Sequence, residues 1–211
     1  MTGKFITFEG PEGGGKSTHA KKLAEFLRSR GITVHLTREP GGSKICERIR
    51  ALVREEMEDP PVTECEVLLF LASRAQLVSN FIRPALERGE WIVCDRFSDS
   101  TFAYQGYGRG VDIEKLRALN DFATDGLKPD LTFLLDVPSS VSKSRLHDRQ
   151  IATSSSADRI ELAGDGFHER LRNGFLEMAK KEPSRFVVVD SSREVEAVDA
   201  EIEKALGVFG L

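Results

Sequence analysis

The 211-residue sequence predicts an α/β fold in which helices flank a five-stranded parallel sheet on both sides, giving three layers. Three observations support this prediction. Short apolar runs are typical of buried strands, longer stretches with helical spacing lie between them, and a glycine-rich loop directly follows the first run. Strands that alternate with helices form βαβ units, and such sheets bind ligands at the carboxyl ends of their strands.

The expected strands are short runs rich in β-branched and aromatic residues. Runs of this kind, with no polar alternation, suit central strands that are buried on both faces. In chain order they are residues 5–8, 33–36, 91–94, 131–137 and 186–189.

The expected helices fill the intervals between these runs. The first begins near Lys16, because Ala20, Leu23, Ala24 and Leu27 fall at helical spacing, and a glycine follows at position 31. The serine-rich stretch 152–157 predicts a loop. The remaining helices are expected at residues 64–88, 113–123, 139–147, 166–181 and 195–206.

The overall composition limits the possible classes of function. A net charge of −4 argues against broad nucleic-acid binding, which requires an excess of basic residues. The three cysteines lack metal-ligand spacing and are expected to be reduced thiols. With no signal peptide and no stretch expected to cross a bilayer, the chain is predicted to be a single cytoplasmic domain, residues 1–211, without membrane contact.

The glycine-rich loop is the most specific motif in the chain. Residues 10–17 read G-P-E-G-G-G-K-S and match the phosphate-binding P-loop, G-x-x-x-x-G-K-[ST]. Backbone N–H groups of such a loop surround a phosphate, the lysine reaches the β- and γ-phosphates, and the serine hydroxyl ligates Mg²⁺. We therefore expect ATP to be bound by Gly10, Pro11, Glu12, Gly13, Gly14, Gly15, Lys16, Ser17 and Thr18.

A P-loop alone is compatible with regulatory GTPases, motor ATPases and small-molecule kinases. The sequence has neither the Asn-Lys-x-Asp element that reads guanine nor the Asp-x-x-Gly element of a GTPase switch. A motor ATPase is usually larger. The length therefore favours a small-molecule kinase.

Three further segments, taken with the P-loop, resemble thymidylate kinases. They are R-E-P-G-G at 38–42, followed by Ser43 in place of the usual threonine, L-F-L-A-S-R at 69–74, and D-R-F-S-D-S-T-F-A-Y-Q-G at 95–106. The resemblance spans nearly the whole chain. It implies the three-layer P-loop fold, transfer of the γ-phosphoryl group of ATP to dTMP to give dTDP, and a homodimer.

The resemblance also implies roles for residues that bind the acceptor. Arg38 is expected to bind the phosphate of dTMP. Phe70 and Arg74 are four residues apart and share a helix face, which suits a flat ligand. The resemblance implies that Phe70 stacks on thymine and that Arg74 donates to its O4 carbonyl. Glu12 is expected near the sugar and phosphate, and the deoxyribose and base pocket is expected to contain Ser100, Tyr104 and Gln105.

The same resemblance assigns Arg96 to the region between the donor and acceptor phosphates. Asp95 is expected to support Mg²⁺ together with Ser17, either directly or through water. The P-loop carries no arginine, which resembles the bacterial arrangement, in which arginines of a lid over the site, here about 145–161, supply the charge. Arg149 is the leading candidate, and Arg145 and Arg159 stay open because residues 150–157 contribute no arginine.

The expected mechanism needs no general base. The nucleophile is a phosphate oxygen that is already largely ionised at neutral pH. Catalysis would come from alignment and charge neutralisation by Lys16, Arg96, Arg149 and Mg²⁺. Two alternatives remain at this level: a kinase for another nucleoside monophosphate or a nucleoside, and a P-loop module that binds nucleotide without catalysis.

Overall fold

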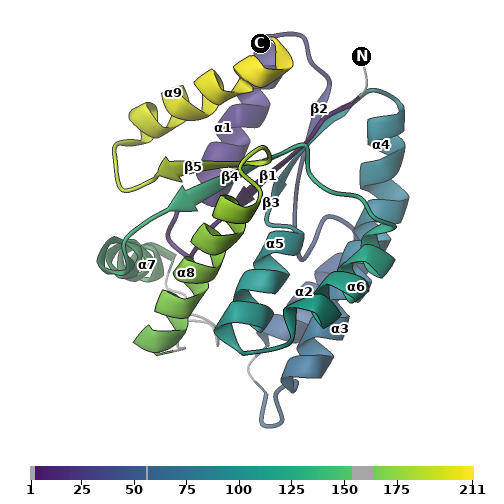
Figure 1. Ribbon diagram of the computed structural model, residues 1–211, viewed down its shortest axis with the longest axis vertical. Coiled ribbons are helices and arrows are strands. Elements are labelled where there is room, and N and C mark those ends of the chain that lie inside the picture. The colour runs from purple at the N-terminus through teal and green to yellow at the C-terminus, as the bar shows by residue number, and fades with distance from the viewer. Residues whose placement is uncertain (1–2, 56, 154–163) are drawn as a thin grey trace.

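The computed structural model describes residues 3–55, 57–153 and 164–211 (Figure 1). Five parallel strands form one sheet in the order β2-β3-β1-β4-β5. The five-stranded parallel sheet expected from the sequence is therefore confirmed. The strands are β1 (Phe5–Glu9), β2 (Val34–Arg38), β3 (Trp91–Asp95), β4 (Leu131–Asp136) and β5 (Phe186–Asp190).

The central strand β1 is buried on both faces because helices cover both sides of the sheet. In register, Ile6 lies opposite Val93 of β3 and Leu131 of β4. Ile6 and Phe8 point to the face covered by α1 and α9, whereas Phe5 points to the face packed by η1 and α4. Each face thus has its own apolar cluster, and the loop after β1 emerges at the centre of the sheet edge (Figure 1).

The helical elements follow the predicted ranges closely, with two additions. They are α1 (Lys16–Ser29), α2 (Lys44–Arg54), α3 (Thr63–Leu77), the π-helical η1 (Val78–Ile82), α4 (Arg83–Glu87), α5 (Ser98–Thr101), the π-helical η2 (Phe102–Gly108), α6 (Ile113–Thr124), α7 (Ser139–Thr153), α8 (Asp165–Lys181), α9 (Val195–Ala205) and the 3-10 helix η3 (Leu206–Phe209). Residues 152 and 153 of the loop expected at 152–157 belong to α7, so that part of the expectation is wrong, and residues 154–157 lie outside the described residues.

The helices α2 and α5–η2 were not predicted. α2 gives a weak apolar signal, since only Cys46 and Val53 are buried on it, and it is started by the Ser43 hydroxyl, which accepts from the Cys46 N–H. The sequence of η2 gives a weak helical signal because it contains glycines at 106 and 108. A Cβ at Gly108 would lie 2.5 Å from the ring of Phe167, so the missing side chain lets α8 pack directly against η2.

The continuous helical run Thr63–Glu87 corrects the expectation that no stretch of the chain could cross a bilayer. By length and composition it could cross a membrane, a test that core helices of soluble proteins also pass. In the structure this run packs against α2 and α6, and the side chains of Val67, Leu71 and Leu77 are buried. Core packing thus accounts for the apolar residues at these buried positions.

Candidate active site

A cavity of about 680 Å³ opens at the carboxyl ends of β1, β2 and β3. Its walls come from the P-loop, the loop after β2, helices α2, α3 and α7, and the segment from β3 to η2. Most of the predicted site residues meet here, although Gly10, Pro11 and Gly14 do not line the cavity. Those that do are Glu12, Gly13, Gly15, Lys16, Ser17, Thr18, Arg38, Phe70, Arg74, Asp95, Arg96, Ser100, Tyr104, Gln105 and Arg145.

The P-loop adopts a conformation that requires glycine. Gly13 has φ +72°, and a Cβ there would approach the Ser142 carbonyl oxygen to 2.7 Å. The Lys16 ammonium donates to the carbonyl oxygens of Gly10 and Pro11 at 2.9 and 2.6 Å. Burial, with the neighbouring Arg96 charge, lowers the pKa of Lys16 to about 8. The loop therefore holds a poorly hydrated cation beside the N-terminus of α1, an arrangement suited to an anion.

Arg96 connects the P-loop to η2. Its backbone is left-handed, with φ +70°, and its guanidinium donates to Glu12 Oε1 at 2.7 Å and to the Ser100 hydroxyl at 3.1 Å. The Tyr104 hydroxyl donates to the same Glu12 oxygen at 2.6 Å. Burial alone would raise the pKa of Glu12, but the Arg96 and Lys16 charges lower it overall. Glu12 is thus an ionised centre that orients Arg96.

Glu9, at the end of β1, was missed in the sequence. Its carboxylate accepts from the Phe97 and Ser100 N–H groups at 2.8 and 3.2 Å and from the Ser100 hydroxyl at 2.6 Å. Burial, together with the Asp99 carboxylate, raises the pKa of Glu9 to about 7. The only sequence signal was a charged residue at the end of an otherwise apolar strand. Glu9 holds in place the backbone segment that presents Arg96.

Ser17 and Asp95 lie side by side, and the Ser17 hydroxyl donates to the Asp95 carboxylate. A hydroxyl and a carboxylate are hard oxygen ligands of the type that Mg²⁺ prefers. The described parts of the chain contain no cluster of three or more histidine, cysteine or acidic side chains suited to a metal. These two residues therefore fit a Mg²⁺ ion, whose remaining ligands would come from phosphates and water.

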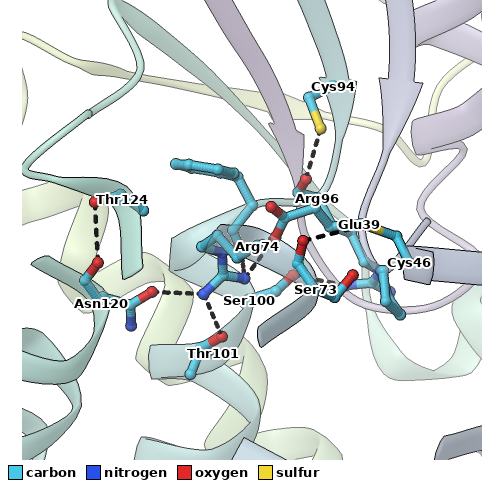
Figure 2. Close-up of polar contacts among 12 residues, drawn as sticks. Glu39, Cys46, Ser73, Arg74, Cys94, Arg96, Ser100, Thr101, Asn120 and Thr124 are labelled. Carbon is cyan, nitrogen blue, oxygen red and sulfur yellow. Dashed lines mark hydrogen bonds and ion pairs between the residues drawn. The ribbon is translucent and has the colours of Figure 1, made fainter. Parts of the chain in front are cut away.

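At the far end of the cavity, α3 contributes Phe70 and Arg74 to the wall. The Arg74 side chain is buried, and Figure 2 shows how its guanidinium is surrounded. It donates through Nε to Glu39 Oε2 at 2.7 Å and through Nη2 to the Phe97 carbonyl at 3.1 Å. Its Nη1 donates to the side chains of Thr101 and Asn120. All three nitrogens of Arg74 are thus held by protein oxygens.

The partners of Arg74 form a network that sequence reasoning did not find. Glu39 and Thr101 lay inside the motifs at 38–42 and 95–106 without an assigned role, whereas Asn120 carried no signal at all. Burial raises the pKa of Glu39, and its Oε1 is buried without a hydrogen-bond partner. The network fixes the position of Arg74 at the cavity wall.

Two more predicted residues have well-defined surroundings. Gln105 is buried on η2, and its amide nitrogen donates to Glu66 Oε1 of α3 at 2.8 Å. Arg38 lies at the rim, where its side chain is 53% exposed and pairs with Glu47 of α2 at 3.1 Å. Cavity-lining residues that the sequence did not single out are Glu39, Pro40, Arg50, Val53, Arg54, Phe97 and Thr101.

The lid arginines are only partly described. Arg145 of α7 lines the cavity and donates through Nη1 to the carbonyl oxygens of Gly13 and Ser191 at 3.3 and 2.8 Å. Arg149 belongs to the same helix, but its side chain lies outside the described part of the structure, as does the whole of Arg159. Which of the three reaches a transferring phosphate stays a prediction.

Comparison with known proteins gives one consistent result. The family model for thymidylate kinase matches residues 8–202. Thymidylate kinases of Desulfovibrio desulfuricans and Pseudomonas fluorescens are each 46% identical to this chain, over 207 and 206 residues, covering 97% and 98% of it and 95% and 96% of their own lengths. A crystal structure of thymidylate kinase from Ehrlichia chaffeensis matches 98% of this chain and 99% of its own with a TM-score of 0.77 at 36% identity. The resemblance inferred from the motifs is confirmed, and the chain belongs to the thymidylate kinase family.

Proposed function

We propose that the protein transfers the γ-phosphoryl group of ATP to the phosphate of dTMP, producing dTDP. The observation that supports this most directly is a single cavity with a P-loop at one end, Phe70, Arg74 and Gln105 at the other, and Arg96 between them. Relatives named thymidylate kinase match this chain along nearly their full length and support the same conclusion.

The P-loop end binds the donor. Lys16 exchanges its bonds to the Gly10 and Pro11 carbonyls for the β- and γ-phosphate oxygens of ATP, which are stronger acceptors because they are charged. The N-terminus of α1 adds partial positive charge at the same point. Ser17 and Asp95 would hold Mg²⁺, which neutralises phosphate charge when bound.

Arg38 and Arg96 bind the acceptor phosphate, and Arg96 also lies close to the P-loop through Glu12. One ionised oxygen of dTMP attacks the γ-phosphorus and the bond to the β-phosphate oxygen breaks, so no proton has to be removed. The main barrier is repulsion between two polyanions. Cations fixed in a partly dry cavity lower this barrier. A lid arginine, with Arg149 as the leading candidate, completes the charge.

A coupled assay of ADP release with Mg²⁺-ATP tests this proposal. The acceptors are dTMP, dUMP, dCMP, dGMP, UMP and thymidine, and strong preference for dTMP with no turnover of thymidine is expected. Turnover of another monophosphate but not dTMP would leave a P-loop kinase of different specificity. The absence of acceptor-dependent turnover would indicate a binding module instead.

We also propose a cytoplasmic homodimer. The described structure presents exposed apolar side chains on α2, α3 and α6, which lie together in Figure 1, with Leu68 58% and Phe122 88% exposed. In the segment 67–72, Val67 and Leu71 face the core while Leu68 faces outward, so only one side of this helix is available to a partner. The free thiols of Cys46, Cys65 and Cys94 are compatible with a reducing compartment.

Sedimentation equilibrium at micromolar concentration tests the dimer. The wild-type protein should sediment as a dimer, and Phe122→Ser should shift it toward monomer. Val208→Ser, at a 73% exposed position on η3, serves as the matched control. A wild-type monomer at all concentrations would contradict the proposal.

A further inference from the structure

The orientation of the Gln105 side-chain amide is fixed from outside the cavity. The amide nitrogen donates to Glu66 Oε1 at 2.8 Å, and both side chains are almost completely buried, at 2% and 1% exposure. The same Glu66 oxygen receives an ion pair from Arg109 at 3.1 Å. Glu66 of α3, which does not line the cavity, thus contacts Gln105 of η2, which lines it.

Only one orientation of the amide is compatible with this contact. A carboxylate in an ion pair accepts hydrogen bonds and cannot donate, and the Glu66 carboxylate is paired with Arg109. Turning the amide over would bring the Gln105 carbonyl oxygen against the Glu66 carboxylate in a buried place. Two acceptors in contact there would both lose a hydrogen bond and repel each other.

The amide carbonyl is therefore the end of Gln105 left for a ligand. Among the hydrogen bonds between described residues, none involves Gln105 Oε1, and Gln105 lines the cavity near Phe70 and Arg74. A carbonyl oxygen selects a donor. Thymine and uracil carry one on the pairing edge of the ring, the N3–H group, whereas cytosine has an unprotonated acceptor nitrogen at that position.

We propose that Glu66 is a positioning residue that sets the base specificity of the site: by fixing the amide of Gln105, it makes the site accept bases with an N3–H donor and reject cytosine. This inference rests on the proposed function, because it assumes that the base of the acceptor lies against Gln105. It assigns to Glu66 a role in specificity, with no contact to the substrate.

The first test replaces Glu66 by methionine, which has a similar volume but no carboxylate to accept a hydrogen bond from the Gln105 amide. Equilibrium titrations measure the Kd for dTMP, dCMP and ATP, and the ADP-release assay measures kcat/KM. With the amide free to turn, the preference for dTMP over dCMP should fall about tenfold, while the Kd for ATP stays within about twofold. Glu64→Met, at an exposed position on the same helix, is the matched control and should change neither quantity.

The second test asks whether Glu66 acts through Gln105. In a Gln105→Met background, Glu66→Met should have no further effect on the dTMP-to-dCMP preference, since there is no amide left to orient. A merely structural role of the ion pair between Glu66 and Arg109 would lower stability equally in both backgrounds and leave the preference unchanged. An unchanged preference in Glu66→Met, or an equal loss in both backgrounds, overturns the inference.

A measurement on the wild-type protein covers the case in which Glu66→Met does not fold. In a crystal structure with dTMP, the Gln105 amide should contact Glu66 at one end and the N3 position at the other. An amide that leaves Glu66, or that does not reach the base, overturns the inference. Wild-type protein that phosphorylates dTMP while these results fail would leave the proposed function intact, whereas wild-type protein that neither binds nor phosphorylates dTMP would overturn both.

Discussion

The two ends of the cavity are built in different ways. At the phosphate end (residues 10–18, Asp95 and Arg96), several charged groups lie on loops and are held by backbone carbonyls or by one another, as Lys16 is by Gly10 and Pro11. At the base end (Glu39, Glu66, Arg74, Gln105 and Asn120), the polar side chains are buried and bonded to one another in two sets. Arg74 of α3 bonds to Glu39 and to Asn120 of α6 (Figure 2), and Gln105 of η2 bonds to Glu66 of α3.

This difference predicts different costs of substitution. A cation that can exchange backbone carbonyls for ligand phosphates contributes to binding and catalysis more than to the fold. A buried ion pair with every nitrogen partnered contributes to stability only while both partners remain, because removing one leaves the other uncompensated. Substitutions at the phosphate end should thus reduce activity alone, and those at the base end should reduce stability as well.

The largest effect on activity is expected for Lys16→Ala. Loss of a positioned charge in a partly dry site should lower kcat/KM by roughly 10³-fold or more, equivalent to at least about 4 kcal/mol of transition-state stabilisation. The thermal midpoint should change little, because the Lys16 ammonium is poorly hydrated and bonded only to its own loop. Lys21→Ala, at an exposed position on α1, is the control. Retention of more than about a tenth of wild-type turnover would contradict the role of Lys16.

At the base end, Arg74→Met should produce the largest loss of stability. It leaves Glu39 buried without its cation, and breaking a buried pair in this way costs about 3–5 kcal/mol. Urea unfolding would measure the change. A second substitution, Glu39→Gln, should restore part of the loss, since no buried charge then remains.

Comparing the free energies of unfolding of Arg74→Met and Lys16→Ala tests whether the two ends differ. If Arg74→Met and Lys16→Ala lowered the free energy of unfolding equally, the distinction between the ends would be wrong. If Glu39→Gln failed to improve Arg74→Met, the loss would come from the contacts of Arg74 to Thr101 and Asn120 and not from the unpaired carboxylate.

The same contrast explains what the sequence could and could not predict. The P-loop is contiguous, so its glycines, Lys16 and Ser17 were recognised directly, and the strands were recognised by their apolar runs. Arg74 was recognised in a motif, but its partners Thr101 and Asn120 come from elements that meet only in the folded chain. Glu66 and Asn120 carry no local signal, because a buried polar residue differs from an exposed one only by its surroundings. For Glu9 the sequence offers only a charged residue at the end of an apolar strand.

A smaller and pH-dependent effect is expected from Glu9. Its pKa is raised from 4.5 to about 7 by burial and the Asp99 carboxylate, against the opposing influence of Ser100, Arg96 and the Phe97 N–H. Between these values the native state holds a proton that the unfolded state has released. The free energy of unfolding should therefore fall as pH rises from about 4.5 to about 7, by at most about 3 kcal/mol from this group.

Glu9→Gln tests this assignment, because glutamine remains neutral and imitates the protonated acid. The free energy of unfolding is measured in urea from pH 4 to pH 8. In the variant it should fall much less over that window than in the wild type. At pH 8 the variant should equal or exceed the wild type in stability. An unchanged pH profile would show that Glu9 does not titrate in the window.

The smallest effect is expected for Glu47→Gln at the rim, where the base end and the phosphate end meet. Glu47 pairs with the half-exposed Arg38 at 3.1 Å and also accepts from the Gly42 N–H at 3.0 Å, but solvent screens the ion pair, which contributes less than about 1 kcal/mol. The free energy of unfolding should hardly change.

Without its carboxylate partner, Arg38 is held less firmly, so KM for dTMP should rise about twofold to threefold at constant kcat. Raised salt should shrink the difference between the variant and the wild type, because salt weakens in the wild type the ion pair that the variant already lacks. A large fall in kcat instead would mean that Arg38 acts in the transition state and not only in binding the acceptor.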